Sequence, residues 1–308
     1  MGKDAKNWGL LLILAIIWGS SFILMKRGMF TMNGEAIFSS HQVAALRMTI
    51  AGIVLLPFAI KGLKQIQSVK EVVLLTIVGL SGNFLPSYLF TYSQTGVSSG
   101  YAGMLNSLTP IFTMLISLIV FKSRLTYIQL IGLTIGSTGI IMLVISGSNS
   151  VENLKLNGTW LHILAIVLGT LCYAISITTI KFTMQKFKAI EITSLAFLMV
   201  LIPSVFSFFQ LNTISTIQLN IHALEGLGYI ATLSVFGTAI AVLLFNKLIS
   251  DSSTLFASSV TYFIPIVAIL IGISFGEQIN ILQIGAMIIV LLGVFIANYW
   301  SMIFKKKV

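Results

Sequence analysis

The chain has 308 residues, of which 57% are hydrophobic and only 8% are charged, and its mean hydropathy is +1.03. A soluble domain of this length cannot bury so much apolar surface, and such domains carry about 25% charged residues. The composition therefore excludes a soluble enzyme, a secreted disulfide scaffold and a disordered chain, and it predicts a polytopic membrane protein. The one cysteine, Cys172, allows neither an intramolecular disulfide nor a cysteine-based metal site.

The net charge of +10 does not indicate a nucleic-acid partner, because the basic residues stand between apolar runs and form no face of a soluble domain. In a membrane protein these residues report topology. The bilayer and a small-molecule substrate are the partners that we expect, and no cofactor or metal is expected.

Ten apolar runs are long enough to cross a bilayer, which takes about 20 residues in a helix. They are continuously apolar, whereas the strands of a membrane β-barrel alternate between apolar and polar residues. The predicted spans are 8–26, 39–60, 70–92, 98–121, 126–146, 160–181, 189–209, 224–249, 254–275 and 281–303. We therefore expect an all-α membrane protein with ten transmembrane helices and short connections. The first run is too long for a signal peptide and is followed by Lys26-Arg27 without a cleavage pattern, so we expect it to be a span.

The distribution of Lys and Arg predicts that both termini are cytoplasmic in a bacterial inner membrane. With ten spans and a cytoplasmic N-terminus, the outer connections hold Lys26, Arg27 and Lys155, and Arg47 lies inside a span. The cytoplasmic segments hold Lys3, Lys6, Lys61, Lys64, Lys70, Lys122, Arg124, Lys181, Lys186, Lys188, Lys247, Lys305, Lys306 and Lys307. A bias of fourteen to three is a strong positive-inside signal.

The two halves of the chain resemble each other. Pro110-Ile and Pro265-Ile are 155 positions apart, and Gln129-Leu-Ile-Gly132 returns as Gln283-Ile-Gly285 with the offset drifting to 153. General apolar likeness would not reproduce such landmarks in order. We predict two repeats of five spans, residues 1–150 and 151–308. Since five is odd, the second is inverted, an arrangement that places a transporter's substrate site between the halves near the midplane.

Several motifs resemble those of one family. They are Trp18-Gly-Ser-Ser-Phe22 with Lys26, Leu46-Arg47, Gly100-Tyr-Ala-Gly-Met-Leu-Asn-Ser-Leu-Thr-Pro110 and Phe275-Gly-Glu277-Gln. In this order, with ten spans, they resemble the EamA-type transporters of the drug/metabolite transporter superfamily. The resemblance implies export of amino acids, drugs or other small metabolites. The chain departs from the pattern at Ser123-Arg124, where the family often has Glu-Arg, and at Cys172-Tyr173, where a Trp is common.

Arg47 is the one formally charged side chain well inside a predicted span. Such a placement costs about 2.5–3.5 kcal/mol at the centre of a helix, and snorkelling relieves part of that cost. Arg47 is interpreted either as a counter-charge for a substrate carboxylate or as a structural residue that binds backbone carbonyls between helices.

Further candidate substrate contacts are aromatic or polar residues within spans. Trp18 and Phe22 belong to span 1, and for Trp18 we favour the cavity over an interfacial belt, while Lys26 is expected at the outer surface. A buried polar residue either lines a cavity or makes an interhelical hydrogen bond. The remaining candidates are Asn83, Tyr88, Asn106, Tyr173, Asn246 and Tyr262.

Pro86, Pro110 and Pro265 lie inside spans, where each removes a backbone donor, and they are candidate hinges for gating or static kinks. The Gly132-Leu-Thr-Ile-Gly136 face is expected to pack closely against another helix, either within the chain or in a homodimer. No acidic residue falls at mid-span, and Glu277 is expected at a helix end.

The sequence therefore favours a secondary transporter that works by alternating access. A lipid or lipid-linked solute flippase of similar fold is the alternative. A membrane-embedded enzyme would need paired acids, a His cluster or a nucleophile and base at depth, and a channel would need a filter motif or charged ring. The sequence shows neither pattern, and it contains no Walker A motif.

Overall fold

The computed structural model describes residues 3–122, 126–149, 159–251 and 260–297, and regular structure in these ranges is helical apart from one isolated β-bridge between Phe30 and Ala36. The all-α prediction is confirmed. The first repeat contains α1 (Lys3–Met29), α2 (Ser40–Gly62), η1 (Leu63–Gln65), α3 (Val69–Gly79), η2 (Leu80–Phe84), α4 (Leu85–Ser93), α5 (Ser99–Leu105), η3 (Asn106–Leu108), α6 (Thr109–Ile119) and α7 (Tyr127–Asn149). The second contains α8 (Thr159–Thr183), α9 (Ala189–Gln210), α10 (Thr213–Leu219), α11 (Ala223–Ser234), η4 (Val235–Ile240), α12 (Ala241–Asp251), α14 (Val260–Ser274) and α15 (Ile281–Phe295).

The number of membrane crossings agrees with the prediction of ten. Within the described residues, eight helical segments are long and apolar enough to span a bilayer, and two shorter apolar helices, Phe263–Ser274 and Ile281–Phe295, stand at the last two predicted spans. Two of the described crossings contain a π-helical segment: α3, η2 and α4 form one, and α11, η4 and α12 form another. The beginning of the ninth predicted span and the end of the tenth lie outside the described residues.

The short helix α10 was not predicted. It follows Asn212, whose φ of 50° turns the chain sharply after α9. The buried amide of Gln42 on α2 fixes this turn, because its Nε2 donates to the Leu211 carbonyl at 3.0 Å and to Thr216 Oγ1 at 2.8 Å. A turn of this kind carries too few apolar residues to be recognised by hydropathy.

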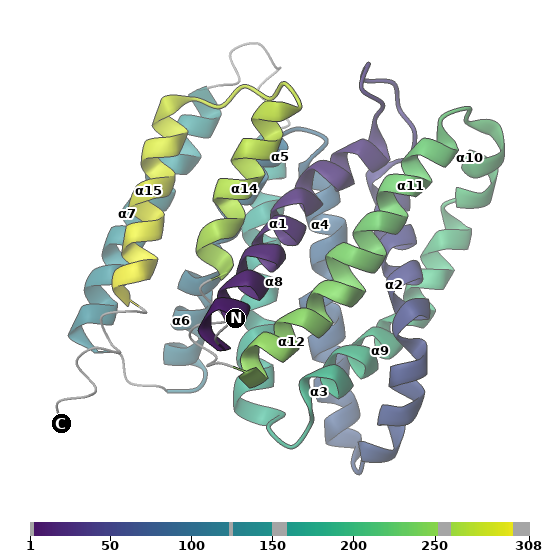
Figure 1. The fold of residues 1–308 in the computed structure, drawn as a ribbon, viewed down its shortest axis with the longest axis horizontal. Coiled ribbons are helices and arrows are strands. Elements are labelled where there is room, and N and C mark those ends of the chain that lie inside the picture. Colours follow the sequence, from purple (N-terminus) through teal and green to yellow (C-terminus); the bar gives the residue numbers. More distant parts are fainter. Residues whose placement is uncertain (1–2, 123–125, 150–158, 252–259, 298–308) are drawn as a thin grey trace.

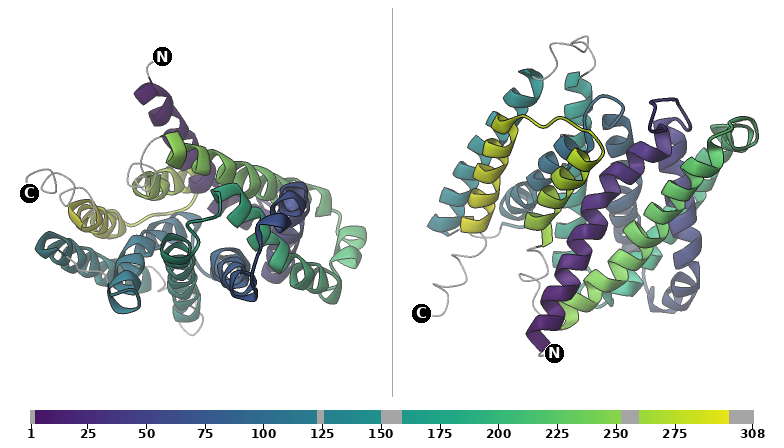
Figure 2. Two further views of the ribbon diagram at one scale, coloured as in Figure 1. Left: turned by 90° about the horizontal axis from the view of Figure 1, so that it is seen from below. Right: turned by 45° about the horizontal axis from the view of Figure 1, so that its top comes forward.

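Helices of corresponding spans of the two repeats pack against each other. α2 lies along α9, α7 lies along α15, and α5 of the fourth span lies along α14 of the ninth. The α7–α15 pair forms one edge of the molecule, as the views in Figures 1 and 2 both show. The fold therefore interleaves the two halves.

The glycines of α7 allow the closest of these contacts. A Cβ on Gly293 of α15 would lie 2.2 Å from the Gly136 nitrogen and 2.6 Å from the Gly132 oxygen. The predicted close-packing face of Gly132 and Gly136 is thus a contact within the chain.

The helix ends define two opposite ends of the bundle. α1 begins and α15 ends toward the same end, and the α14–α15 turn lies at the other (Figure 1). We call the end with the α14–α15 turn the Lys26 end, after the residue in the last turn of α1. We call the opposite end the Lys181 end, after the residue in the last turn of α8.

The α7–α15 contact gives a stability prediction. Gly293→Ala is expected to lower the free energy of unfolding by about 1–3 kcal/mol, because the added methyl group meets backbone atoms that cannot move aside. Thermal unfolding in detergent measures this loss. Gly285→Ala, on the same helix, is the control, since a Cβ there has nothing within 4 Å. Equal melting temperatures for the two variants would contradict the prediction.

Candidate functional site

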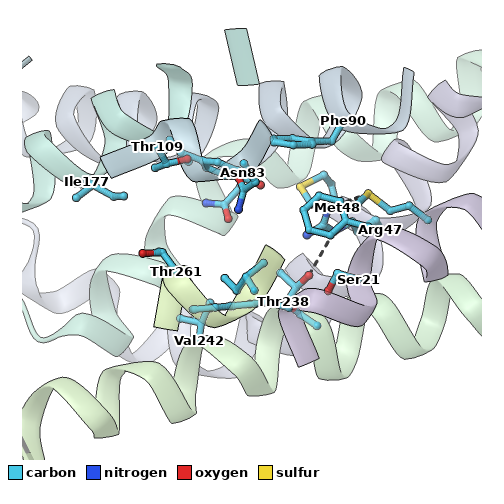
Figure 3. A pocket seen from close by; sticks show the side chains of 18 residues that line it. Ser21, Arg47, Met48, Asn83, Phe90, Thr109, Ile177, Thr238, Val242 and Thr261 are labelled. Atoms are coloured by element: carbon cyan, nitrogen blue, oxygen red, sulfur yellow. Dashed lines mark hydrogen bonds between the residues drawn. The ribbon is translucent and has the colours of Figure 1, made fainter. Parts of the chain in front are cut away.

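A cavity of about 250 Å³ lies between the two repeats and is the candidate site (Figure 3). It is lined by Trp18, Ser21, Phe22, Met25, Arg47, Met48, Gly82, Asn83, Phe90, Asn106, Thr109, Tyr173, Ile177, Gly237, Thr238, Val242, Thr261 and Ile264. Asn83 and Thr109 lie on one wall, and Thr238 and Val242 lie across from them (Figure 3).

Most of the lining consists of residues that correspond between the repeats. Trp18 and Tyr173 are 155 positions apart (173 minus 18), the offset that the prolines show. Five further lining pairs share this offset: Phe22 and Ile177, Gly82 and Gly237, Asn83 and Thr238, Asn106 and Thr261, and Thr109 and Ile264. The cavity is therefore built largely from equivalent positions of the two repeats.

Two π-helical segments, η2 and η4, contribute to the cavity and begin 155 positions apart, at Leu80 and Val235. π-helical turns are rare and are frequent at functional sites. The regular backbone hydrogen bonds of an α-helix are locally interrupted in such a turn. In η4, the Gly237 carbonyl accepts a hydrogen bond from Trp18 Nε1 at 3.1 Å. This hydrogen bond fixes the Trp18 indole against the second repeat.

Each π-helical segment also touches a serine of the other repeat at close range. A Cβ on Gly82 would lie 2.4 Å from Ser176 Oγ, and a Cβ on Gly237 would lie 2.9 Å from Ser21 Oγ. Ser21 and Ser176 are themselves 155 positions apart. The cavity is therefore flanked by two equivalent Ser–Gly contacts between the halves.

Arg47 breaks the symmetry of the cavity. Its Nε donates to Thr238 Oγ1 at 3.4 Å, and its Nη1 lies 3.6 Å from the sulfur of Met25 (Figure 3). Among the ion pairs of the described residues, none includes Arg47. The guanidinium is therefore held by weak neutral acceptors and retains donors for an anionic group.

Aromatic rings from both repeats line the cavity. The Phe90 ring stacks on Tyr173, with centroids 5.6 Å apart, and lies 6.0 Å from the Phe22 ring. Trp18 packs against Phe245 at 5.2 Å. The cavity thus combines one cation, several amide and hydroxyl groups, and flat apolar surfaces.

Six of the nine predicted substrate contacts line the cavity: Trp18, Phe22, Arg47, Asn83, Asn106 and Tyr173. Tyr88 is not in the lining, and its ring lies 4.8 Å from Phe84 and 6.0 Å from His41. The side chains of Asn246 and Tyr262 lie outside the described ones.

The three predicted hinge prolines are not in the lining either. Pro86 follows η2, Pro110 follows the 3-10 segment η3, and Pro265 lies inside α14. Two of the three therefore stand where the helix type changes.

The polar lining residues Ser21, Thr109, Thr238 and Thr261 were not among the predicted contacts. The repeat offset is a signal that could have found two of them, because Thr238 corresponds to Asn83 and Thr261 to Asn106. Thr109 directly precedes the repeated proline.

A ten-helix bundle of two repeats around a polar, aromatic cavity has the architecture of a membrane carrier. A model of the EamA-like transporter family matches residues 7–145 and 160–299, and the chain belongs to this family. The protein is therefore a multi-pass membrane transporter.

Relatives of nearly the same length carry transporter names without a substrate. An uncharacterized transporter of Archaeoglobus fulgidus is 25% identical over 94% of this chain and 98% of its own. The uncharacterized inner membrane transporter YedA of Escherichia coli is 27% identical over 95% and 91%. A crystal structure of another protein shares the fold, with a TM-score of 0.60 at 15% identity over 98% of this chain and 99% of that one.

The Ser–Gly contacts give a prediction on the site. Gly82→Ala is expected to destabilise the protein by about 1–3 kcal/mol, because its methyl group would meet Ser176 Oγ. Ser176→Ala, which removes that oxygen, is expected to restore part of the loss in the double variant. Thermal unfolding of the four proteins of this double-mutant cycle measures the coupling. Purely additive effects would show that the two side chains are not in contact.

Proposed function

We propose that the protein moves small organic solutes that carry a carboxylate, such as amino acids, out of the cell by alternating access. The observation that carries this proposal is the position of Arg47, which lines the cavity and forms none of the ion pairs of the described residues. An arginine in a membrane-spanning bundle needs partners, and a carboxylate can accept two parallel hydrogen bonds from a guanidinium.

The size and chemistry of the cavity support a small substrate. Its volume of about 250 Å³ lies below the 300–1,000 Å³ typical of pockets for drug-sized ligands. Asn83 and Asn106 supply amide groups that suit an ammonium or hydroxyl group, and Phe90 and Tyr173 supply ring faces. A zwitterion or hydroxy acid matches this set.

The inverted repeat supports alternating access, because two similar halves can exchange conformations around a site between them. The positive-inside distribution supports an orientation with both termini in the cytoplasm, so that the Lys26 end faces outward. Export as the direction of net flux rests on the resemblance to the family's exporters.

Arg47→Gln tests the substrate class. A ligand at 100 times its Kd should stabilise the purified protein by about 2.7 kcal/mol, and the shift in melting temperature should disappear in this variant. The panel pairs amino acids and hydroxy acids with their amides and esters, which lack the carboxylate. Arg27→Gln, which removes a positive charge away from the central cavity, is the control. Stabilisation by the amides alone, or a carboxylate shift unchanged in Arg47→Gln, would refute the assignment.

The orientation is tested by fusing a reporter that is active only in the cytoplasm to the C-terminus of the full chain, and in a second protein to the connection before α15. The C-terminal fusion should be active and the other inactive, since an odd number of spans separates the two points. The opposite pattern would reverse the topology, and with it the assignment of the outer end.

A further inference from the structure

The Glu277 carboxylate joins three helical segments at the Lys26 end. Its Oε1 accepts hydrogen bonds from Lys26 Nζ at 2.9 Å and from the Ser99 N–H at 2.8 Å, and its Oε2 accepts one from the Gly100 N–H at 2.9 Å. Lys26 belongs to α1, Ser99 and Gly100 begin α5, and Glu277 lies in the turn between α14 and α15. We call these four residues the Glu277 cluster.

Glu277 is only 7% exposed and Lys26 is 31% exposed. The sequence predicted Glu277 at a helix end and Lys26 at the outer surface, but it gave no indication that they pair. Burial alone would raise the pKa of Glu277, but the Gly100 N–H, the Lys26 ammonium and the Ser99 N–H together hold that pKa below its usual value. The carboxylate is therefore ionised at neutral pH, and each of its hydrogen bonds is charge-assisted.

The Glu277 cluster stands between the central cavity and a second pocket. Met25 is part of the cavity lining, while the next residue, Lys26, lines a pocket of about 530 Å³ together with Ser98 and Glu277. Buried side chains of α1 and α5, including Phe22, Met25 and Tyr101, belong to one apolar core cluster. The Glu277 cluster holds α1 and α5 together here, so a separation of these two helices requires the cluster to break.

In the first repeat, the sequence position equivalent to Glu277 is not acidic. Lys181 is the repeat counterpart of Lys26, at an offset of 155. Near the turn before α15 the offset between the repeats is 154, because Thr126 and Asn280 occupy equivalent helix N-caps. In the first repeat Gln129 Oε1 accepts from the Thr126 N–H at 2.9 Å. In the second repeat Gln283 Oε1 accepts from the Asn280 N–H at 3.1 Å.

With this register, the sequence position that corresponds to Glu277 is Ser123. A serine cannot form an ion pair with Lys181. Among the described residues Lys181 forms no ion pair, and its ammonium lies over the Phe182 ring at 5.3 Å.

We infer that the Glu277 cluster is a one-sided gate latch: it holds the Lys26 end shut in the resting transporter, and it must open for a solute to pass between the cavity and the outer pocket. The inference rests on alternating access as part of the proposed function. Because the position that corresponds to Glu277 is a serine in the first repeat, the Glu277 cluster has no repeat-related counterpart in the sequence at the Lys181 end, and the resting protein favours access to the cavity from that end. An ion pair present in only one of two states shifts their populations by its own free energy.

Cysteine labelling tests the latch without knowledge of the substrate. In a Cys172→Ser background, Asn83→Cys places the one thiol of the protein in the cavity wall. A membrane-impermeant maleimide is applied separately to right-side-out and to inside-out vesicles. The Lys26 end faces the reagent in one preparation, and the Lys181 end faces it in the other. Introducing Glu277→Ala into this background should raise the labelling rate from the Lys26 end about tenfold or more and lower the rate from the Lys181 end. A tenfold change in the ratio of the two access states corresponds to about 1.4 kcal/mol.

Lys26→Ala should give a smaller increase, because the carboxylate keeps its two backbone donors on α5. Lys181→Ala, at the corresponding position of the other repeat, is the matched control and should change neither rate. Glu71→Gln is a second control, since it breaks the Glu71–Lys186 ion pair, which is not part of the cluster. The charge swap Lys26→Glu with Glu277→Lys should not restore the parent rate, because a lysine cannot accept the Ser99 and Gly100 hydrogen bonds.

Melting temperatures of the purified variants establish that they are folded, and Lys26→Ala carries the test alone if Glu277→Ala does not fold. Unchanged labelling in the folded variants, or an equal increase in Lys181→Ala, would overturn the latch. The test of the latch is independent of the substrate assignment, because the labelling rates do not depend on whether a carboxylate binds. If no variant is labelled from either end, both alternating access and the latch are contradicted.

Discussion

A guanidinium placed in the middle of a membrane bundle is the constraint on which the rest of the site depends. Arg47 cannot be left in hydrocarbon without partners, and the described side chains offer it a threonine hydroxyl and a methionine sulfur in place of a carboxylate. A polar cavity must therefore surround it. The π-helical segments η2 and η4 supply part of that cavity by bringing Asn83 and Thr238 to its walls.

The inverted repeat explains the geometry of the cavity, and its departures from symmetry explain the chemistry. The pairs that differ least, Gly82 with Gly237 and Ser21 with Ser176, make the contacts at which the two halves cross. The pairs that differ most in character, such as Phe22 with Ile177 and Thr109 with Ile264, line the solute space. A carrier needs halves that are similar enough to exchange conformations. The lining keeps this similarity at Gly82 and Gly237 and departs from it at pairs such as Thr109 and Ile264.

The sequence predicted the fold well because each crossing is a continuous apolar run and because two halves of odd span number impose inversion. It predicted six of the cavity residues because a buried Arg, Asn or Trp is unusual in a span. It could not separate Tyr88 from these residues, because spacing alone does not show that its ring turns toward Phe84 and His41. The pairing of Lys26 with Glu277 joins positions 251 residues apart, and only packing brings them together.

The two repeats also differ at the ends of the bundle. In a symmetric protein the two access states would have equal free energies, and a solute would find either end open with equal frequency. The carboxylate at position 277 has no counterpart at Ser123, so the two ends differ by a set of charge-assisted hydrogen bonds that only one state can form. A difference of this kind sets which state is populated at rest without altering the binding site. The direction from which a solute first enters is then set by residues that are not part of the cavity lining.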